Sequence, residues 1–281
     1  MNRPQCYTMI TGASDGFGKA LAIECARRGM NLVLAALPGP ELHHLANFIR
    51  KNFFVDVQYF ETNLAIESEI QDLHSKIVDK GLAVNALINN AGIGNTQMFM
   101  ETSTEFITQQ IKLNVLATTL LTNLFIPELK KNSPSYILNV GSLCSFFYLP
   151  QKQVYGGTKS FIHFFSKSLR KELKSDRVSV SVVCPGGMNT NFTTSLMNKK
   201  GNFLSRISIL NPEQVAPLVI QKMLRGKEVI IPGAVNRFSI VLDKLLPAFL
   251  KNIFTDRLMK QLKPRSISTV EVDKNSSPMA A

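Results

Sequence analysis

The 281-residue sequence contains no tryptophan and only four cysteines, and it has no unbroken apolar run of the roughly 18 residues that a membrane-spanning helix needs. The cysteines are too widely spaced for a disulfide framework or a zinc site: Cys6, Cys25, Cys144 and Cys184. We therefore expect no metal site, and mostly buried thiols in a reducing compartment. The first residues also lack the apolar stretch of a secretory signal, so the sequence predicts a cytoplasmic protein.

Acidic residues are in short supply, with 20 Asp and Glu against 32 Lys and Arg, and the formal net charge is +12. Half of this excess lies between Arg225 and Arg265, where nine basic residues stand against three acidic ones. An excess of charge at one end of a chain indicates what the protein binds more than how it folds. Because no nucleic-acid-binding motif accompanies the charge, we expect no nucleic acid partner.

Apolar segments of strand length alternate with amphipathic segments of helix length along most of the chain. The predicted strands are 7–11, 32–36, 54–60, 84–88, 136–140, 178–184 and 228–231. The predicted helices run from the first glycine turn to residue 28, across 42–49 and 66–77, and then over 103–131, 153–174 and 212–225. This order favours an α/β fold, with a doubly wound, Rossmann-like parallel sheet in a single domain over residues 1–234. Ligands of such sheets bind at the carboxyl ends of the strands, so five turns should share one crevice: 12–18, 36–40, 89–94, 141–150 and 185–191.

The first of these turns carries three glycines between a strand and a helix, Gly12, Gly16 and Gly18. Glycine permits a tight turn and lets the backbone approach a pyrophosphate, whose charge is stabilised by the free N–H groups at the start of the helix. Turns are often rich in glycine, so three glycines alone are weak evidence for a nucleotide-binding site. Its place between the first strand and the first helix makes it a candidate dinucleotide site.

Four further motifs follow in order along the chain. The five motifs are Thr11-Gly-Ala-Ser-Asp-Gly-Phe-Gly18, Asn89-Asn-Ala-Gly92, Ser142 after the fifth strand, Tyr155-Gly-Gly-Thr-Lys159 and Pro185-Gly-Gly-Met-Asn-Thr190. Together they resemble the short-chain dehydrogenase/reductase family over about residues 5–232. One such motif arises easily by chance, whereas five in the right order on the right elements are specific.

The resemblance implies four catalytic residues. Tyr155 would protonate a carbonyl oxygen during reduction, or deprotonate the alcohol during oxidation. Its pKa is near 10 when free, and Lys159, four residues later on the same helix face, is expected to lower that pKa and to hold the ribose hydroxyls. Ser142 would orient the substrate oxygen, and Asn114 would support a water chain from the lysine to solvent.

The resemblance also implies a nicotinamide dinucleotide as cofactor. The expected cofactor-binding residues are Gly12, Ser14, Asp15, Gly16, Phe17, Gly18, Ala36, Leu37, Asn63, Leu64, Asn90, Ala91, Gly92, Tyr155, Lys159, Pro185, Gly186 and Thr190. Thr190 would bond the nicotinamide carboxamide, and Pro185 and Gly186 would wall the ring.

The position that selects the cofactor departs from the family pattern. An acid at the end of the second strand grips the ribose of NAD, and a base there accepts the 2′-phosphate of NADP. Here the residues are Ala36 and Leu37, which carry neither marker. Absence of an acid removes repulsion towards a phosphate, so we favour NADP(H) and leave NAD(H) open.

An apolar substrate is expected from two segments near the catalytic serine. Residues 191–211 form the predicted substrate lid, which is rich in Phe, Leu and Ile, and residues 146–149 add another apolar wall. Such a pocket suits a hydrophobic carbonyl or alcohol, such as a steroid-like or fatty compound. The same side chains are equally expected if they merely pack the lid onto the domain.

Residues 235–265 form a predicted basic amphipathic extension, and 266–281 a disordered tail. The extension suits peripheral contact with an anionic membrane, and equally suits packing on another subunit or on the domain itself. The family resemblance implies a homodimer or homotetramer formed through the helices at 103–131 and 153–174. The uncharged stretch 113–127 is consistent with that interface.

The sequence therefore predicts an enzyme that transfers a hydride between NAD(P)(H) and a hydrophobic carbonyl or alcohol. The rival hypotheses are an NADP-binding regulatory protein without turnover and a membrane-associated scaffold. Relatives that only sense the cofactor usually lose the tyrosine or the lysine of the fourth motif, and this chain keeps both Tyr155 and Lys159.

Overall fold

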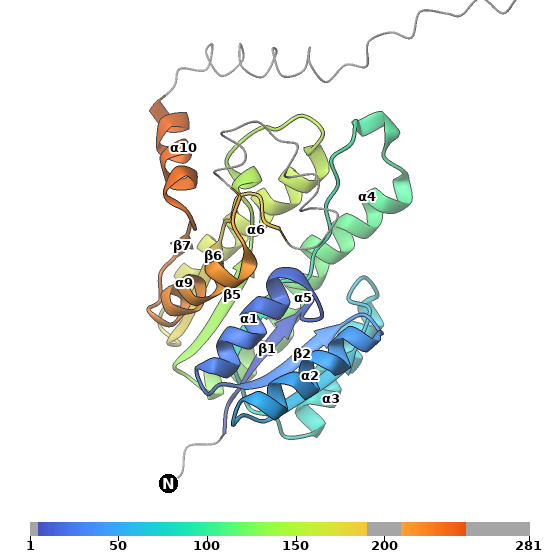
Figure 1. Ribbon diagram of the computed structural model, residues 1–281, viewed down its shortest axis with the longest axis vertical. Coiled ribbons are helices and arrows are strands. Elements are labelled where there is room, and N and C mark those ends of the chain that lie inside the picture. The colour runs from blue at the N-terminus through green and yellow to red at the C-terminus, as the bar shows by residue number, and fades with distance from the viewer. Residues whose placement is uncertain (1–4, 190–208, 246–281) are drawn as a thin grey trace, which may run out of the picture.

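A seven-stranded sheet forms the centre of the computed structural model, which describes residues 5–189 and 209–245 (Figure 1). The strands are β1 (Tyr7–Thr11), β2 (Asn31–Ala36), β3 (Val57–Glu61), β4 (Val84–Asn89), β5 (Ser135–Val140), β6 (Val178–Val183) and β7 (Val229–Ile230). They lie in the order β3-β2-β1-β4-β5-β6-β7, and every neighbouring pair is parallel. The prediction of a doubly wound parallel sheet is confirmed. The winding direction reverses between β1 and β4, which is where ligands bind in sheets of this kind.

Helices cover both faces of the sheet. They are α1 (Gly16–Arg27), α2 (Pro40–Asn52), α3 (Glu67–Asp79), α4 (Thr104–Ile111), the π-helical segment η2 (Lys112–Ala117), α5 (Thr118–Lys131), α6 (Gln153–Glu172), α9 (Pro212–Leu224) and α10 (Ala234–Leu245), with short 3-10 turns η1 (Phe99–Glu101) and η3 (Leu143–Ser145). One buried cluster joins the sheet to α1, α2 and α9, and a second joins it to α3, α5 and α6. The strands read as continuous apolar runs because side chains on both faces are buried.

Two predicted elements differ from the structure. The third strand begins at Val57 rather than at residue 54, because its pairing with β2 starts only where Leu32 lies opposite Val57. Phe54, before that point, is fully exposed at the sheet edge. The predicted helix over 103–131 is continuous in direction but contains the π-helical segment η2, and insertions of this kind frequently mark functional sites.

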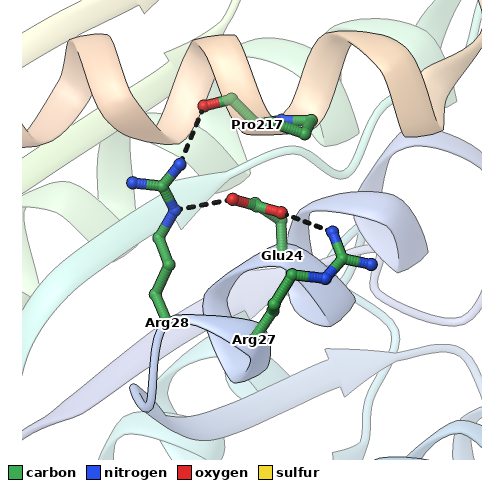
Figure 2. A network of polar contacts seen from close by, with 4 residues as sticks. All are labelled: Glu24, Arg27, Arg28 and Pro217. Atoms are coloured by element: carbon green, nitrogen blue, oxygen red, sulfur yellow. Dashed lines mark hydrogen bonds and ion pairs between the residues drawn. The ribbon is translucent and has the colours of Figure 1, made fainter.

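A buried carboxylate ties α1 to α9 on one face of the sheet (Figure 2). Glu24 accepts hydrogen bonds from Arg27 (2.8 Å) and from Arg28 (2.6 Å), and Arg28 also donates to the carbonyl oxygen of Pro217 at 3.2 Å. Buried carboxylates are stable only when paired in this way. The network therefore fixes the helix that begins at the glycine turn against the last helix of the domain.

A chain of buried polar side chains ties α5 and α6 to the other face. Asn89 at the end of β4 donates to Thr122 (3.0 Å) and to Asn139 on β5 (2.9 Å). Asn139 in turn donates to Ser166 on α6 at 2.9 Å. Because each link would otherwise leave a polar group buried without a partner, the chain specifies how α6 lies on the sheet.

Several sequence predictions concern residues that the structure describes only in part. The predicted lid 191–211 is described only for residues 209–211, and the tail 266–281 lies outside the described residues. The extension 235–265 is described up to residue 245, where α10 follows β7 at one end of the molecule (Figure 1). Apolar side chains on α10 are exposed, among them Phe238, Val241 and Leu245, so contact with a membrane or a subunit stays a prediction. Within the described segments, no helix combines the length and the apolar content needed to cross a bilayer.

Candidate active site

The glycine turn after β1 is closed onto the end of β4. Gly12 has a φ of +62°, and a Cβ there would stand 2.9 Å from the Cα of Ala91. A Cβ on Gly18 would stand 2.0 Å from the carbonyl oxygen of Gly12. Asn90 donates from its side chain to the carbonyl oxygens of Thr11 (2.9 Å) and Gly12 (3.1 Å). The glycines are therefore required sterically, and the side chain of Asn90 braces the turn itself.

The first turn of α1 suits an anion. Its N-cap, Asp15, makes no side-chain capping bond to the helix within the described part of the chain. The first N–H groups of a helix have no intrahelical partner, and the helix dipole adds positive potential there. Gly16 and Gly18 keep side chains away from these groups. The turn at 12–18, which also contains Ser14 and Phe17, thus fits the pyrophosphate of a dinucleotide.

The carboxyl end of β2 lies beside the same turn, since the N–H of Ala13 donates to the carbonyl oxygen of Ala35 at 3.3 Å. Ala36 is buried and Leu37 is exposed, so neither side chain offers charge to a ribose. An acid nevertheless reaches this place from the neighbouring strand. Glu61, in register with Ala36, accepts a hydrogen bond from the N–H of Gly39 at 3.2 Å.

Asn63 and Leu64, expected near the adenine, follow β3 in the next turn. The side-chain oxygen of Asn63 accepts from the N–H of Ala65 at 3.1 Å, and Leu64 is buried. Asn63 therefore shapes this turn.

Asn114 lies in the π-helical segment and is 1% exposed. Its side-chain oxygen accepts from the N–H of Ile93 (2.9 Å), and its amide donates to the carbonyl oxygen of Ile93 (2.9 Å) and to Thr158 of α6 (3.1 Å). A Cβ on Gly92 would stand 3.0 Å from the oxygen of Asn114 and 3.3 Å from the Nζ of Lys159. Asn114 and Gly92 thus bring the end of β4 and the lysine together.

Ser142, Tyr155 and Lys159 converge between the end of β5 and the first turn of α6. The ammonium of Lys159 donates to the carbonyl oxygen of Val140 at 2.8 Å and lies 5.8 Å from the centre of the Tyr155 ring. The side chains of Ser142 and Tyr155 are hydrogen bonded to each other. The ring of Tyr155 also packs on Gly94, where a Cβ would stand 2.6 Å from Cδ2. The three groups that the sequence places together are therefore together in the structure.

The pKa of Tyr155 differs from the prediction. Burial raises the pKa of Tyr155 to about 12, and the hydrogen bond to Ser142, which favours the phenolate, does not overcome it. The same burial lowers the pKa of Lys159 to about 8, because an ammonium also loses solvation there. The net lowering of the tyrosine pKa that the sequence predicts is therefore not found, since spacing on a helix gives proximity but not the cost of desolvation.

The turn after β6 completes the group. The N–H of Leu143 donates to the carbonyl oxygen of Pro185 at 2.8 Å, so this turn adjoins the one that carries Ser142. A Cβ on Gly186 would stand 2.8 Å from the amide of Asn236, which is buried in the first turn of α10. Thr190, the last expected cofactor-binding residue, lies outside the described residues.

Two residues in this region were missed by sequence reasoning. Glu61 enters only because β3 lies next to β2, and the strand order was the signal that could have revealed it. Asn236 has no such signal, because its contact with Gly186 joins segments that are 50 residues apart in numbering. Within the described ranges, no three His, Cys, Asp or Glu side chains gather as metal ligands would.

Comparison with known proteins agrees with this geometry. A family model described as short chain dehydrogenase matches residues 7–201. The very-long-chain 3-oxoacyl-CoA reductase of Mus musculus is 32% identical over 185 residues, which are 64% of this chain and 58% of that protein. The reductase of the same name from Meyerozyma guilliermondii is 31% identical over 255 residues, covering 87% of this chain and 71% of that protein.

Among solved structures, a short-chain dehydrogenase from Sphingobium yanoikuyae in complex with NADPH has 25% sequence identity and a TM-score of 0.73. The match covers 95% of this chain and 99% of that one. The matched region of the mouse reductase amounts to little more than half of its length, so its substrate is not carried over with the fold. The family model, which spans more than half of the chain, shows that this protein belongs to the short-chain dehydrogenase family, and the described residues of the five motifs lie at one edge of the sheet as that family requires.

Proposed function

We propose that the protein is an NAD(P)(H)-dependent oxidoreductase that acts on a hydrophobic carbonyl or alcohol, with Tyr155 as its acid–base residue. The observation that carries the proposal is the convergence of a phenol, an ammonium and a hydroxyl beside the glycine turn. A dinucleotide, when bound, supplies or accepts the hydride. Every other step falls to residues of this chain.

Tyr155 carries the proton. With a pKa of about 12 the phenol holds its proton at neutral pH, so it is set to donate to a substrate oxygen. Ser142, hydrogen bonded to the same phenol, would hold that oxygen in reach of it. As the proton leaves, the ammonium of Lys159 stabilises the phenolate, since an opposite charge at this distance favours the ionised form.

The remaining residues bind and position. The backbone of the turn at 12–18 would bind the pyrophosphate, and Asn90, Ala91 and Gly92 would line the adenosine side. Asn114 would place water against Lys159, consistent with its burial beside that lysine. Pro185 and Gly186, beside the turn of Ser142, would wall the reacting ring.

The choice of NADP(H) rests on two observations. Ala36 places no acid at the end of β2, and the Sphingobium relative was solved with NADPH. The carboxylate of Glu61 near Gly39 works against a 2′-phosphate, so NADH belongs in every binding test beside NADPH.

Substrate class is proposed from the relatives and from the apolar wall. The matched reductases act on 3-oxoacyl-CoA according to their names, which is a ketone on a fatty chain. Phe146 contacts the buried cluster of Ile162, Val182 and Cys184 beside the catalytic serine, which gives one apolar side to the site. A fatty 3-oxo compound fits both.

The experiment that tests the function compares wild type with Tyr155→Phe. Fluorescence titration with NADPH and NADH measures binding, and a screen of fatty and steroid ketones measures turnover. We expect the variant to bind the preferred dinucleotide within about threefold of wild type and to lose turnover by at least a hundredfold, the scale of a general acid. Normal turnover in the variant, or a wild type that binds neither dinucleotide, would refute the proposal.

A further inference from the structure

A second lysine, Lys152, lies over the ring of Tyr155 and has no part in the mechanism above. Its Nζ is 5.3 Å from the ring centre, and that of Lys159 is 5.8 Å away. Both distances are within the range of a cation–π contact. The phenol of the proposed acid is therefore flanked by two ammonium groups rather than one.

The backbone holds Lys152 in place. It is the N-cap of α6, and its carbonyl oxygen accepts from the N–H of Gly156 at 2.6 Å. The residue before it, Gln151, has a φ of +62°, a left-handed conformation that is uncommon outside glycine. The carbonyl oxygen of Gln151 accepts from the N–H of Gln97, in the loop after β4, at 3.2 Å. Strained backbone of this kind persists where the surroundings require it, often at functional sites.

The two lysines differ in how their charge is satisfied. Lys159 is almost fully buried and donates to Val140. Lys152 is half-buried, and in the described part of the chain it takes part in none of the ion pairs. Burial lowers the pKa of Lys152, which shows that its ammonium is poorly solvated where it stands. A cation that is partly desolvated and unpaired is costly to the fold.

Among the described residues, no acidic side chain forms an ion pair with Lys152 or Lys159. No Asp or Glu of these residues shifts the pKa of either lysine. The site around the proposed acid thus carries two positive charges and no carboxylate within the described ranges. An anion that entered it would be attracted by both lysines, and it could pair with Lys152 without breaking an ion pair.

We propose that Lys152 binds an anionic group of the substrate and that this group lies close to the reacting carbonyl. The substrate class is then an oxo acid, with an apolar chain and a carboxylate close to the ketone. This inference rests on the proposed function, because it places the carbonyl on Tyr155. The contact of Lys152 with that ring keeps the ammonium on the residue that would meet the carbonyl.

The test uses one ketone in a charged and a neutral form, 3-oxododecanoate and its methyl ester. Wild type is expected to favour the carboxylate in kcat/KM on the order of 10- to 100-fold, the scale of a hydrogen bond to a charged group. Lys152→Met should bring this ratio to within about threefold, because it removes the charge that distinguishes the two substrates. Lys152→Arg should keep most of the preference, because guanidinium also pairs with carboxylate.

Lys171→Met is the matched control, since it removes one lysine from the exposed last turn of the same helix. Its carboxylate-to-ester ratio should equal that of wild type. An unchanged ratio in Lys152→Met, or equal loss of both substrates, would overturn the inference and would assign Lys152 to support of the tyrosine or of the helix.

Binding separates this inference from the proposed function. Calorimetry with dodecanoate and its methyl ester, in the presence of the preferred dinucleotide, reports on the charge without any turnover. Selective binding of the carboxylate that Lys152→Met abolishes supports the inference, and equal binding of both compounds contradicts it. Failure of the proposed function appears elsewhere, as a wild type that binds neither NADPH nor NADH.

Discussion

Replacing Gly18 with alanine should damage the fold and the dinucleotide site together. The added Cβ would stand 2.0 Å from the carbonyl oxygen of Gly12 and 2.5 Å from the amide nitrogen of Asn90. Neither the Gly12 carbonyl nor the Asn90 side chain can move away from the new Cβ without cost. The first is backbone of the turn, and the second donates the hydrogen bonds that close the turn onto β4.

The magnitude follows from these contacts. Relief of the clash requires the turn and helix α1 to separate by about 1 Å, and overpacking of this kind costs typically 1–3 kcal/mol, or more when backbone must move. Loss of hydrogen bonds from Asn90 adds about 1 kcal/mol each. We expect the free energy of unfolding to fall by about 3–5 kcal/mol, a large share of the 5–15 kcal/mol typical of a domain.

Urea unfolding followed by circular dichroism measures the loss, and fluorescence titration with NADPH and NADH measures binding. The folded fraction of Gly18→Ala should bind at least about tenfold more weakly, because the shifted turn no longer presents its N–H groups to a phosphate. Gly157→Ala is the control. Its Cβ would meet nothing within 4 Å in the second turn of α6, and alanine is favoured over glycine in a helix by about 0.5–1 kcal/mol. If Gly18→Ala unfolds within 1 kcal/mol of wild type and binds as well, the steric account of the turn is wrong.

Two further predictions concern charge. The pKa of Lys159 is lowered from 10.5 to about 8 in the folded protein. Below pH 8 the lysine is charged in both the folded and the unfolded protein, and the burial of its charge destabilises the fold. Between about pH 8 and 10.5 only the unfolded chain still holds the proton, so the free energy of unfolding rises with pH. Lys159→Met removes this rise, so its stability relative to wild type should fall on the order of 2–4 kcal/mol across that window in urea unfolding, and a constant difference would contradict the assignment. Glu61→Gln should tighten NADPH binding about three- to tenfold with little effect on NADH, since it removes a negative charge from the end of β3, beside the end of β2. Equal effects on both dinucleotides would show that Glu61 does not face the 2′-phosphate.

The sheet and its convergent turns could be predicted because their signals are local. Apolar runs of strand length alternate with helical stripes, and a parallel sheet brings the carboxyl ends of its strands to one edge. Knowing that Ser142 follows one strand and that Gly12 follows another is therefore enough to place both at that edge. The four-residue spacing of Tyr155 and Lys159 adds a shared helix face.

The sequence could not predict contacts that depend on strand order or on burial. The position of Glu61 beside the cofactor-selecting turn can be inferred only once β3 is known to lie beside β2. The pKa of Tyr155 rises because of how deeply α6 packs, which no spacing reveals. The π-helical segment likewise contains Asn114, whose side chain contacts Ile93 and Thr158, and these partners are distant in sequence.

The structure also separates what fixes proton transfer from what fixes the substrate. Tyr155 and Lys159 stand on α6, whose place on the sheet is set by Asn139 and Ser166 more than one helical turn away. Lys152 instead precedes the helix and depends on the hydrogen bond between Gln97 and Gln151, which joins two loops. Loops tolerate change that a helix packed on a sheet does not. Substitutions in these loops can therefore move Lys152 while Tyr155 and Lys159 keep their geometry. The fold thus permits the substrate to vary without a change in the residues that transfer the proton.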